Sequence, residues 1–212
     1  MSYFITILLD QYNLIRRNVA SQDVISETEQ RVAANSKEGK LLDKIYHYYD
    51  GNKQKFESLA MEVARIVISE DGAGANCYPG WITKKSGDHG IDFVMRIDVG
   101  KERLAGIKII VLGQAKCTSP NSPTNGMDIG RTVARLKRGW IGVFVTLSYF
   151  TKSVQVEVNE DHYPIVLING KKVANVVQEE LVKYGTSLRE YLDSLDKKYK
   201  IENHIPEDIL RE

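Results

Sequence analysis

Three polar residues in the middle of the chain carry side chains suited to chemistry on a charged substrate. Asp92 lies between Ile91 and Phe93, so its carboxylate stands in an apolar stretch. Further along, Gln114 and Lys116 are separated by a single alanine. Asp is depleted in strands, and a buried carboxylate needs a partner or a metal ion. These positions combine a carboxylate, a neutral amide oxygen and an ammonium group, a set that points to function.

Hydrolysis of a phosphodiester bond needs this mixture of groups. A carboxylate and an amide oxygen can hold a hard divalent cation, which prefers oxygen ligands. Such a cation polarises the phosphate and lowers the pKa of a bound water, and an ammonium group stabilises the developing negative charge. Lys116 alone would mark no more than the exposed end of a strand, so its significance depends on Asp92 and Gln114. Together the three residues favour a metal-dependent nuclease.

Two predicted strands would bring these groups together. Ile91–Ile97 and residues 106–117 both have strand patterns, and the second is almost continuously apolar at its centre, which indicates burial on both faces. Alternate residues of a strand leave the same face of a sheet, so Gln114 and Lys116 share a face. If the two strands pair as a hairpin, Asp92 joins them on that face.

Helical and strand patterns alternate along the rest of the chain and predict an α/β sandwich with a central mixed β-sheet flanked by helices. Apolar spacing near the N-terminus indicates helices, interrupted near Asn35-Ser36 and Gly39. We divide the chain into an N-terminal helical segment (1–50), a nuclease core (51–172) and a C-terminal helical tail packed on the core (173–212). The other expected elements are a helix over 55–69, a hairpin turn over Val99–Leu104, a helix over 127–138, a strand over 140–146, a short helix over 151–159, a strand over 163–168 and helices over 173–199.

Composition indicates an ordinary globular protein. The 212 residues are 42% hydrophobic and 27% charged, with a net charge of +1, so positive charge for a DNA partner must be concentrated on one face. No apolar run approaches the ~20 residues that a membrane span needs, and Met1–Leu9 lacks the basic start of a signal peptide. Cys77 and Cys117 lack the spacing of a zinc site or a disulfide framework. We therefore expect a cytoplasmic protein with reduced thiols and no membrane partner.

Several short motifs give the chain a family resemblance. They are Phe56-Glu57-Ser58-Leu59, Gly87-Asp88-His89-Gly90-Ile91-Asp92, Gln114-Ala115-Lys116, and Gly142-Val143-Phe144-Val145-Thr146 with Ser148-Tyr149-Phe150-Thr151. In these motifs the sequence resembles the PD-(D/E)XK nucleases, and more narrowly the Mrr-like restriction endonucleases whose second motif is Gln-x-Lys. The likeness covers roughly residues 55–170. The Gln-Ala-Lys form is similar to the cleavage domain of modification-dependent restriction enzymes of the MspJI type.

The resemblance implies a role for each matching residue. It makes Asp92 a metal ligand, Gln114 a second ligand and Lys116 the catalytic lysine, with Mg²⁺ as the cofactor. Glu57 would be an auxiliary acid near the metal, with Glu62 a weaker candidate, although Glu57 could equally be a helix N-terminal charge. The sequence departs from the broader family because Gln114 replaces the usual acid and no proline precedes Asp92. The first departure leaves the metal affinity and the number of metal ions open.

A basic stretch at Gly130–Arg138 offers candidate contacts to DNA phosphates. Arg131 and Arg135 lie one predicted helical turn apart in it and could clamp phosphates from one helix face. A solvated helix face explains the stretch equally well on charge alone. His89, just before Asp92, is a further candidate for a phosphate or water contact, although a loop histidine is more often neither.

The leading hypothesis is an endodeoxyribonuclease that cuts double-stranded DNA with Mg²⁺ in type II restriction of foreign DNA, with dependence on DNA modification left open. One centre cuts one strand, so double-strand cleavage predicts a homodimer or a partner DNA-recognition domain. The loop over 119–127 could itself read DNA. A non-catalytic DNA-binding or assembly module is the alternative that Gln114 permits. A repair or junction-resolving nuclease would share the chemistry and differ in substrate.

Overall fold

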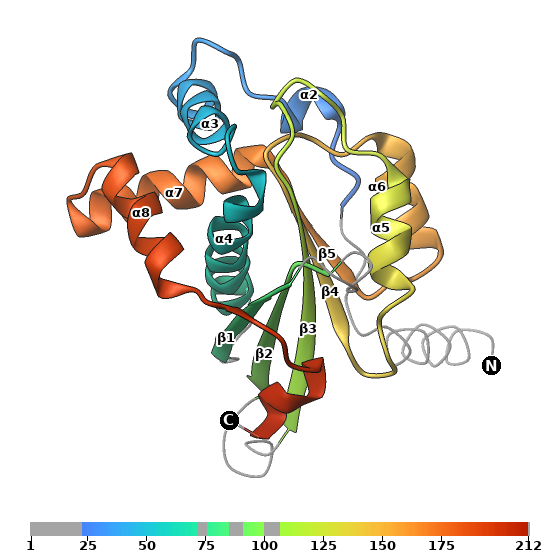
Figure 1. Cartoon of the computed structure of the whole chain (residues 1–212). Coiled ribbons are helices and arrows are strands. Elements are labelled where there is room, and N and C mark those ends of the chain that lie inside the picture. Colours follow the sequence, from blue (N-terminus) through green and yellow to red (C-terminus); the bar gives the residue numbers. More distant parts are fainter. Residues whose placement is uncertain (1–22, 72–75, 85–90, 100–106, 212) are drawn as a thin grey trace.

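The computed structural model describes residues 23–71, 76–84, 91–99 and 107–211. No helix in these ranges is both long enough and apolar enough to cross a membrane. In chain order the elements are α2 (Glu27–Gln30), α3 (Lys37–Tyr48), η1 (Lys53–Lys55), α4 (Phe56–Asp71), β1 (Asn76–Thr83), β2 (Phe93–Val99), β3 (Ile107–Lys116), α5 (Gly126–Val133), β4 (Ile141–Thr146), α6 (Lys152–Glu160), β5 (Ile165–Ile168), α7 (Gly170–Tyr184), α8 (Leu188–Lys198), β6 (Ile201–Glu202) and η3 (Pro206–Arg211) (Figure 1).

The strands form one mixed sheet in the order β5-β4-β3-β2-β1-β6. β1, β2 and β3 pair antiparallel in sequence, whereas β4 and β5 continue the sheet in parallel beyond β3. β6 adds a short parallel pairing at the other edge. The α/β fold with a central mixed sheet flanked by helices is therefore confirmed, and β3 lies in the interior of the sheet as its apolar centre predicted.

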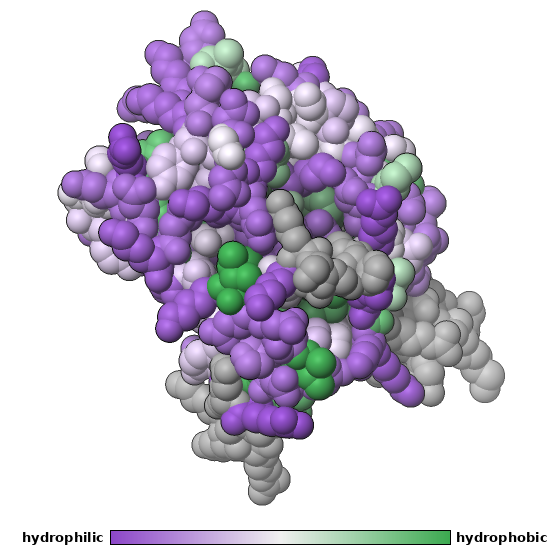
Figure 2. Space-filling model, viewed as in Figure 1, coloured by the Kyte–Doolittle hydropathy of each residue, from purple (hydrophilic) through white to green (hydrophobic). Residues whose placement is uncertain are grey.

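Helices cover both faces of this sheet (Figure 1). α4 lies against one face and contacts α7 and α8, and α3 packs on α7. α5 and η3 contact the opposite face, on β3 and its neighbours. We call these the α4 face and the α5 face. Seen from outside, the surface in view is largely hydrophilic with small, separate apolar areas (Figure 2), so the apolar side chains are mostly inside.

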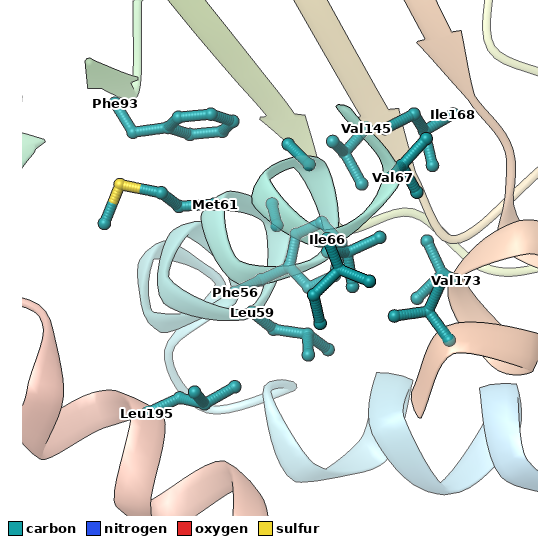
Figure 3. Close-up of a cluster of buried hydrophobic side chains, with 14 of the residues drawn as sticks. Phe56, Leu59, Met61, Ile66, Val67, Phe93, Val145, Ile168, Val173 and Leu195 are labelled. Carbon is teal, nitrogen blue, oxygen red and sulfur yellow. The ribbon is translucent and has the colours of Figure 1, made fainter. Parts of the chain in front are cut away.

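The α4 face holds the main core. Phe56 and Leu59 of α4 are fully buried, together with Phe93 of β2 and Val145 of β4 (Figure 3). The predicted apolar stripe of residues 55–69 supplies the helix side of this core. Complete burial of such large side chains is the main favourable term in the stability of a domain. This core fixes the sheet that carries Gln114 and Lys116.

The sequence analysis did not predict β1. Pro79 and Gly80 lie inside this strand, where the pairing with β2 shifts register between Pro79 and Trp81. A bulge tolerates a proline, which cannot donate to the ladder. A Cβ atom at Gly80 would lie 2.8 Å from the Val94 carbonyl oxygen, so the close approach of the strands needs glycine there.

Helix limits also differ from the prediction at two places. The helix predicted over 127–138 ends at Val133, and the next residues continue in tighter turns before Gly139, at φ 85°. A break near Asn35-Ser36 is confirmed because Ser36 caps the N-terminus of α3. The break predicted near Gly39 is wrong, since Gly39 lies within α3.

The predicted turn over Val99–Leu104 lies almost wholly outside the described residues, as do the first 22 positions of the predicted N-terminal helical segment. The division into 1–50, 51–172 and 173–212 stays a prediction.

Candidate functional site

Asp92 and Gln114 meet where β2 begins and β3 ends. Asp92 donates its backbone N–H to the Gly113 carbonyl oxygen over 2.8 Å, which continues the antiparallel ladder beyond the Phe93–Gly113 pair. Gln114 Nε2 donates to Asp92 Oδ2 over 3.0 Å. The backbone N–H of Ala115 donates to the same oxygen over 2.7 Å. The Asp92 carboxylate is therefore fixed from β3 by one side chain and one main-chain group.

Gly113 makes this meeting possible. A Cβ atom there would lie 1.9 Å from the Phe93 ring, so any other residue would force that buried ring to move. Phe93 itself belongs to the buried core on the α4 face. The close pairing that aligns Asp92 with Gln114 thus depends on the packing of the Phe93 ring directly against Gly113, which has no side chain.

Lys116 shares the face of Gln114 because the two are separated by one residue of the same strand. That face is the α5 face, since Lys116 Nζ contacts Asp128 Oδ2 of α5 over 2.5 Å. The predicted convergence of Asp92, Gln114 and Lys116 on one sheet face is found in the structure. At 41% exposure, the Lys116 side chain is also open to solvent.

α5 contributes two site residues that the sequence analysis missed. Asp128 pairs with Lys116 and lies 3.6 Å from Arg131 Nη1. Thr132, which is fully buried, donates its hydroxyl to Gln114 Oε1 over 3.3 Å or to the Asp128 carbonyl oxygen over 3.2 Å. Positions 128 and 132 lie one helical turn apart, so two polar residues on one face of the predicted helix were the available signal.

A network of hydroxyl groups ties the loop after β3 to the end of β4. The hydroxyls of Thr124 and Thr146 are 2.9 Å apart, and Thr124 N–H donates to the Tyr149 carbonyl oxygen over 2.8 Å. Ser148 donates its hydroxyl to the Ser122 carbonyl oxygen. Thr146 and Ser148 are buried, so they fix the loop beside Lys116 from within.

Glu57 approaches from the other side of the sheet. It lies in the first turn of α4 and is buried, at 7% exposure. The next residue, Ser58, lines a small hollow together with Ile82 of β1. Thr83, which follows Ile82, donates its backbone N–H to the Asp92 carbonyl oxygen over 2.9 Å. The first turn of α4 therefore lies at the Asp92 end of the sheet. A role for Glu57 as an auxiliary acid remains a proposal.

Glu62 belongs to a structural cluster. Its carboxylate accepts hydrogen bonds from Arg65 (2.8 Å), Lys198 (2.9 Å) and the Tyr199 hydroxyl. Burial by itself raises the pKa of Glu62, but the hydrogen bonds from Arg65, Tyr199 and Lys198 outweigh it and lower the pKa to about 2. Glu62 thus joins α4 to α8, an arrangement that accounts for its burial and charge without a catalytic role.

Two of the three residues predicted to contact DNA, Arg131 and Arg135, lie within the described residues. Arg131 is an exposed residue of α5. Arg135 is exposed as well but lies beyond the end of α5, where its N–H donates to the Thr132 carbonyl oxygen over 3.0 Å in a tighter turn. The two arginines therefore do not share one helix face, which corrects that expectation. His89 lies outside the described residues.

The site offers oxygen ligands suited to a hard cation. They are the Asp92 carboxylate and the Gln114 amide oxygen, and hard divalent cations such as Mg²⁺ prefer oxygen. Gln114 presents Nε2 to Asp92 here, and a half-turn of the amide would present Oε1 instead. Thr132 fits both arrangements, because its hydroxyl can accept from Nε2 and still donate to the Asp128 carbonyl oxygen. Within the described ranges, no three His, Cys, Asp or Glu side chains gather as a metal cluster.

Comparisons with known proteins agree with this geometry. Residues 52–177 match the family Mrr_cat, described as restriction endonuclease. The structure of the MspJI restriction endonuclease in complex with a 27-mer oligonucleotide is similar at a TM-score of 0.82 and 40% sequence identity, over 92% of this chain and 43% of that one. The DNA modification-dependent restriction endonuclease AspBHI is similar in fold, at a TM-score of 0.67 and 22% identity, over 85% and 45%.

The chain thus spans less than half the length of either enzyme. No match was found among curated proteins. The predicted likeness to Mrr-like restriction endonucleases, and to modification-dependent enzymes of the MspJI type, is confirmed.

Proposed function

Because the chain belongs to the restriction endonuclease family, we propose that it hydrolyses phosphodiester bonds of double-stranded DNA with Mg²⁺ at a centre formed by Asp92, Gln114 and Lys116. The observation that carries this proposal is the direct hydrogen bond between Gln114 and Asp92 on the sheet face that Lys116 shares. Two oxygen ligands and one ammonium group on one sheet face form a set suited to this chemistry.

Asp92 and Gln114 are the residues that would hold the ion. A bound Mg²⁺ polarises the phosphate and lowers the pKa of a water ligand. The Ala115 N–H, 2.7 Å from Asp92 Oδ2, keeps the carboxylate oriented whether or not Gln114 turns. Gln114 is neutral where an acidic residue would carry a negative charge, so Asp92 supplies most of the negative charge at the ion. The orientation of the Asp92 carboxylate is therefore more important.

Lys116 is placed to act on the substrate. Its ammonium group has three N–H donors, and Asp128 accepts one of them. Because the side chain is 41% exposed, the other donors can reach a phosphate oxygen that approaches from solvent. The ammonium group would stabilise the extra negative charge that forms on the phosphate oxygens in the transition state.

DNA would be held by basic residues around this face. Arg131 lies one turn of α5 from Asp128, and Arg135 is exposed just beyond the helix. Phosphate contacts of this kind position the duplex without reading its sequence. We include His89 with these two arginines as a proposed contact, from its place just before Asp92 in the sequence.

Recognition and double-strand cleavage need a partner. The match covers less than half of each similar enzyme, and one of them is named as modification-dependent. We infer that this chain is a cleavage domain that works as a homodimer or with a DNA-recognition domain, on DNA whose modification directs it. The loop over 119–127 is the part of the domain itself that could contact bases.

A digestion panel tests the proposal. Supercoiled plasmids of known sequence, methylated and unmethylated, are incubated with Mg²⁺ and with wild type, Asp92→Ala or Lys116→Ala. We expect nicked or linear products with wild type alone, and no products when EDTA removes the metal. Equal products from all three proteins would contradict the proposal, because they would come from another activity in the preparation.

The same panel tests the alternative of a non-catalytic DNA-binding module, which the amide at position 114 favours. Wild-type protein that retards DNA in a gel but leaves every substrate intact, branched DNA included, would support that alternative. Cleavage of branched DNA alone would instead indicate a junction-resolving nuclease.

A further inference from the structure

We propose that Asp128 is a positioning residue of this centre, which holds the Lys116 ammonium group where Asp92 and Gln114 meet. The inference rests on the proposed function and adds to it a residue of α5 that acts through Lys116. It starts from the 2.5 Å contact between Lys116 Nζ and Asp128 Oδ2.

α5 is anchored firmly enough to act as a support. Ile129 is buried against Phe144 of β4 and Phe150 after it. On the next turn, Thr132 is fully buried and bonds either Gln114 or the Asp128 carbonyl oxygen. Asp128 therefore projects from a helix in which the residues that follow it, Ile129 and Thr132, are buried against the sheet.

The two partners differ in exposure in the way that positioning requires. Lys116 ends β3 and is 41% exposed, so its long side chain would otherwise sample many rotamers in solvent. Asp128 has a short side chain and is 19% exposed. A fixed carboxylate thus restrains a flexible ammonium group, whereas an ordinary exposed ion pair joins two mobile partners and contributes little.

The negative charge of Asp128 allows a positioning role to be distinguished from a role in DNA binding. Asp128 faces Lys116 and, at 3.6 Å, Arg131. Removing its negative charge would leave both cations free to attract DNA phosphates, so DNA binding would not weaken. The reaction would slow nevertheless, because a misplacement of about 1 Å at a reacting group can cost about 100-fold in rate.

The test compares Asp128→Asn and Asp128→Glu with wild type in steady-state cleavage of a duplex in Mg²⁺. We expect Asp128→Asn to lower kcat by about 10- to 100-fold with KM unchanged or lower. Asp128→Glu keeps the charge and should restore most of kcat. Asp43→Asn is the matched control, since Asp43 also lies beside a basic side chain of its own helix, that of His47, but is exposed on α3, away from the centre. It should leave kcat and KM unchanged.

Circular dichroism and melting temperature check the fold of each variant, and Asp128→Ser replaces Asp128→Asn should the latter not fold. An unchanged kcat, an increased kcat, or a loss confined to KM would overturn the inference. So would a lower kcat that Asp128→Glu does not relieve. If wild type cuts no DNA, the proposed function fails as well, whereas wild-type cleavage with an equally active Asp128→Asn removes this inference alone.

Discussion

The two faces of the sheet treat charged side chains in opposite ways. On the α4 face, Glu62 is buried at 4% exposure and satisfied by Arg65, Lys198 and Tyr199. On the α5 face, Lys116 stays open to solvent and shares Asp128 with Arg131. The first network joins helices, and the second leaves donors available to a substrate. The difference teaches that burial and charge alone do not identify a functional site. The proposal for Lys116 rests instead on its exposure to solvent and on its contact with Asp128, which α5 supports.

The largest expected effect is on the α5 face. Lys116→Ala should lower the cleavage rate about 1,000-fold, because it removes the cation that stabilises the transition-state charge. Its melting temperature should stay close to that of wild type, since Lys116 is partly exposed. Single-turnover cleavage and thermal unfolding measure the two quantities. A Lys116→Ala protein that cleaves DNA at the wild-type rate, or one that does not fold, would contradict this contrast between the two faces.

A substitution in the core should instead lower the stability of the fold. Phe56 is fully buried on the α4 face, so Phe56→Ala should cost about 3–5 kcal/mol of unfolding free energy. Urea denaturation measures the loss. Val182→Ala is the matched control, because Val182 is a 79% exposed apolar residue of α7 and should change stability little. Similar losses in both variants would show that the core assignment is wrong.

A smaller effect is expected from the Glu62 cluster, through pH. The pKa of Glu62 lies at about 2, below its ordinary value of 4.5. The carboxylate therefore contributes stability that is complete above about pH 4.5 and is lost as the pH falls toward 2. We expect Glu62→Gln to lose about 2 kcal/mol at pH 7 and to flatten the stability profile between these pH values. Urea unfolding from pH 2 to 7, with Glu179→Gln as an exposed control, measures it; parallel profiles for Glu62→Gln and wild type would contradict the assignment.

The smallest effect is expected at Thr132. Thr132→Val keeps the buried shape but removes the hydroxyl that contacts Gln114, so the amide loses its support. A loss of about 3- to 10-fold in cleavage rate corresponds to one hydrogen bond of about 1 kcal/mol. Thr132→Ser should restore the rate, and equal rates in both variants would show that the hydroxyl is not needed.

Local patterns were enough to predict that Asp92, Gln114 and Lys116 share one sheet face. Alternation along a strand places Gln114 and Lys116 on one face, and a hairpin between neighbouring strands brings Asp92 beside them. Both rules depend only on residues close in the sequence. The structure shows the meeting through the Gln114–Asp92 hydrogen bond.

Longer-range features could not be predicted in this way. β1 contains Pro79 and Gly80, whose usual turn preference is overridden by a bulge against β2. The contact between Lys116 and Asp128 depends on how α5 packs across the sheet, and no local periodicity states that. The end of α5 at Val133, which leaves Arg135 outside the helix, has the same explanation. Tertiary packing rather than local propensity decides where such a helix ends.

The most direct measurement of the central claim is single-turnover cleavage of a DNA duplex in Mg²⁺ by wild type and Asp92→Asn. The asparagine keeps the size of the side chain and removes the charge proposed to hold the ion. We predict cleavage by wild type, no detectable product from Asp92→Asn, and DNA retardation by both proteins. An Asp92→Asn protein that cuts as fast as wild type would contradict the claim that this carboxylate is part of the catalytic centre.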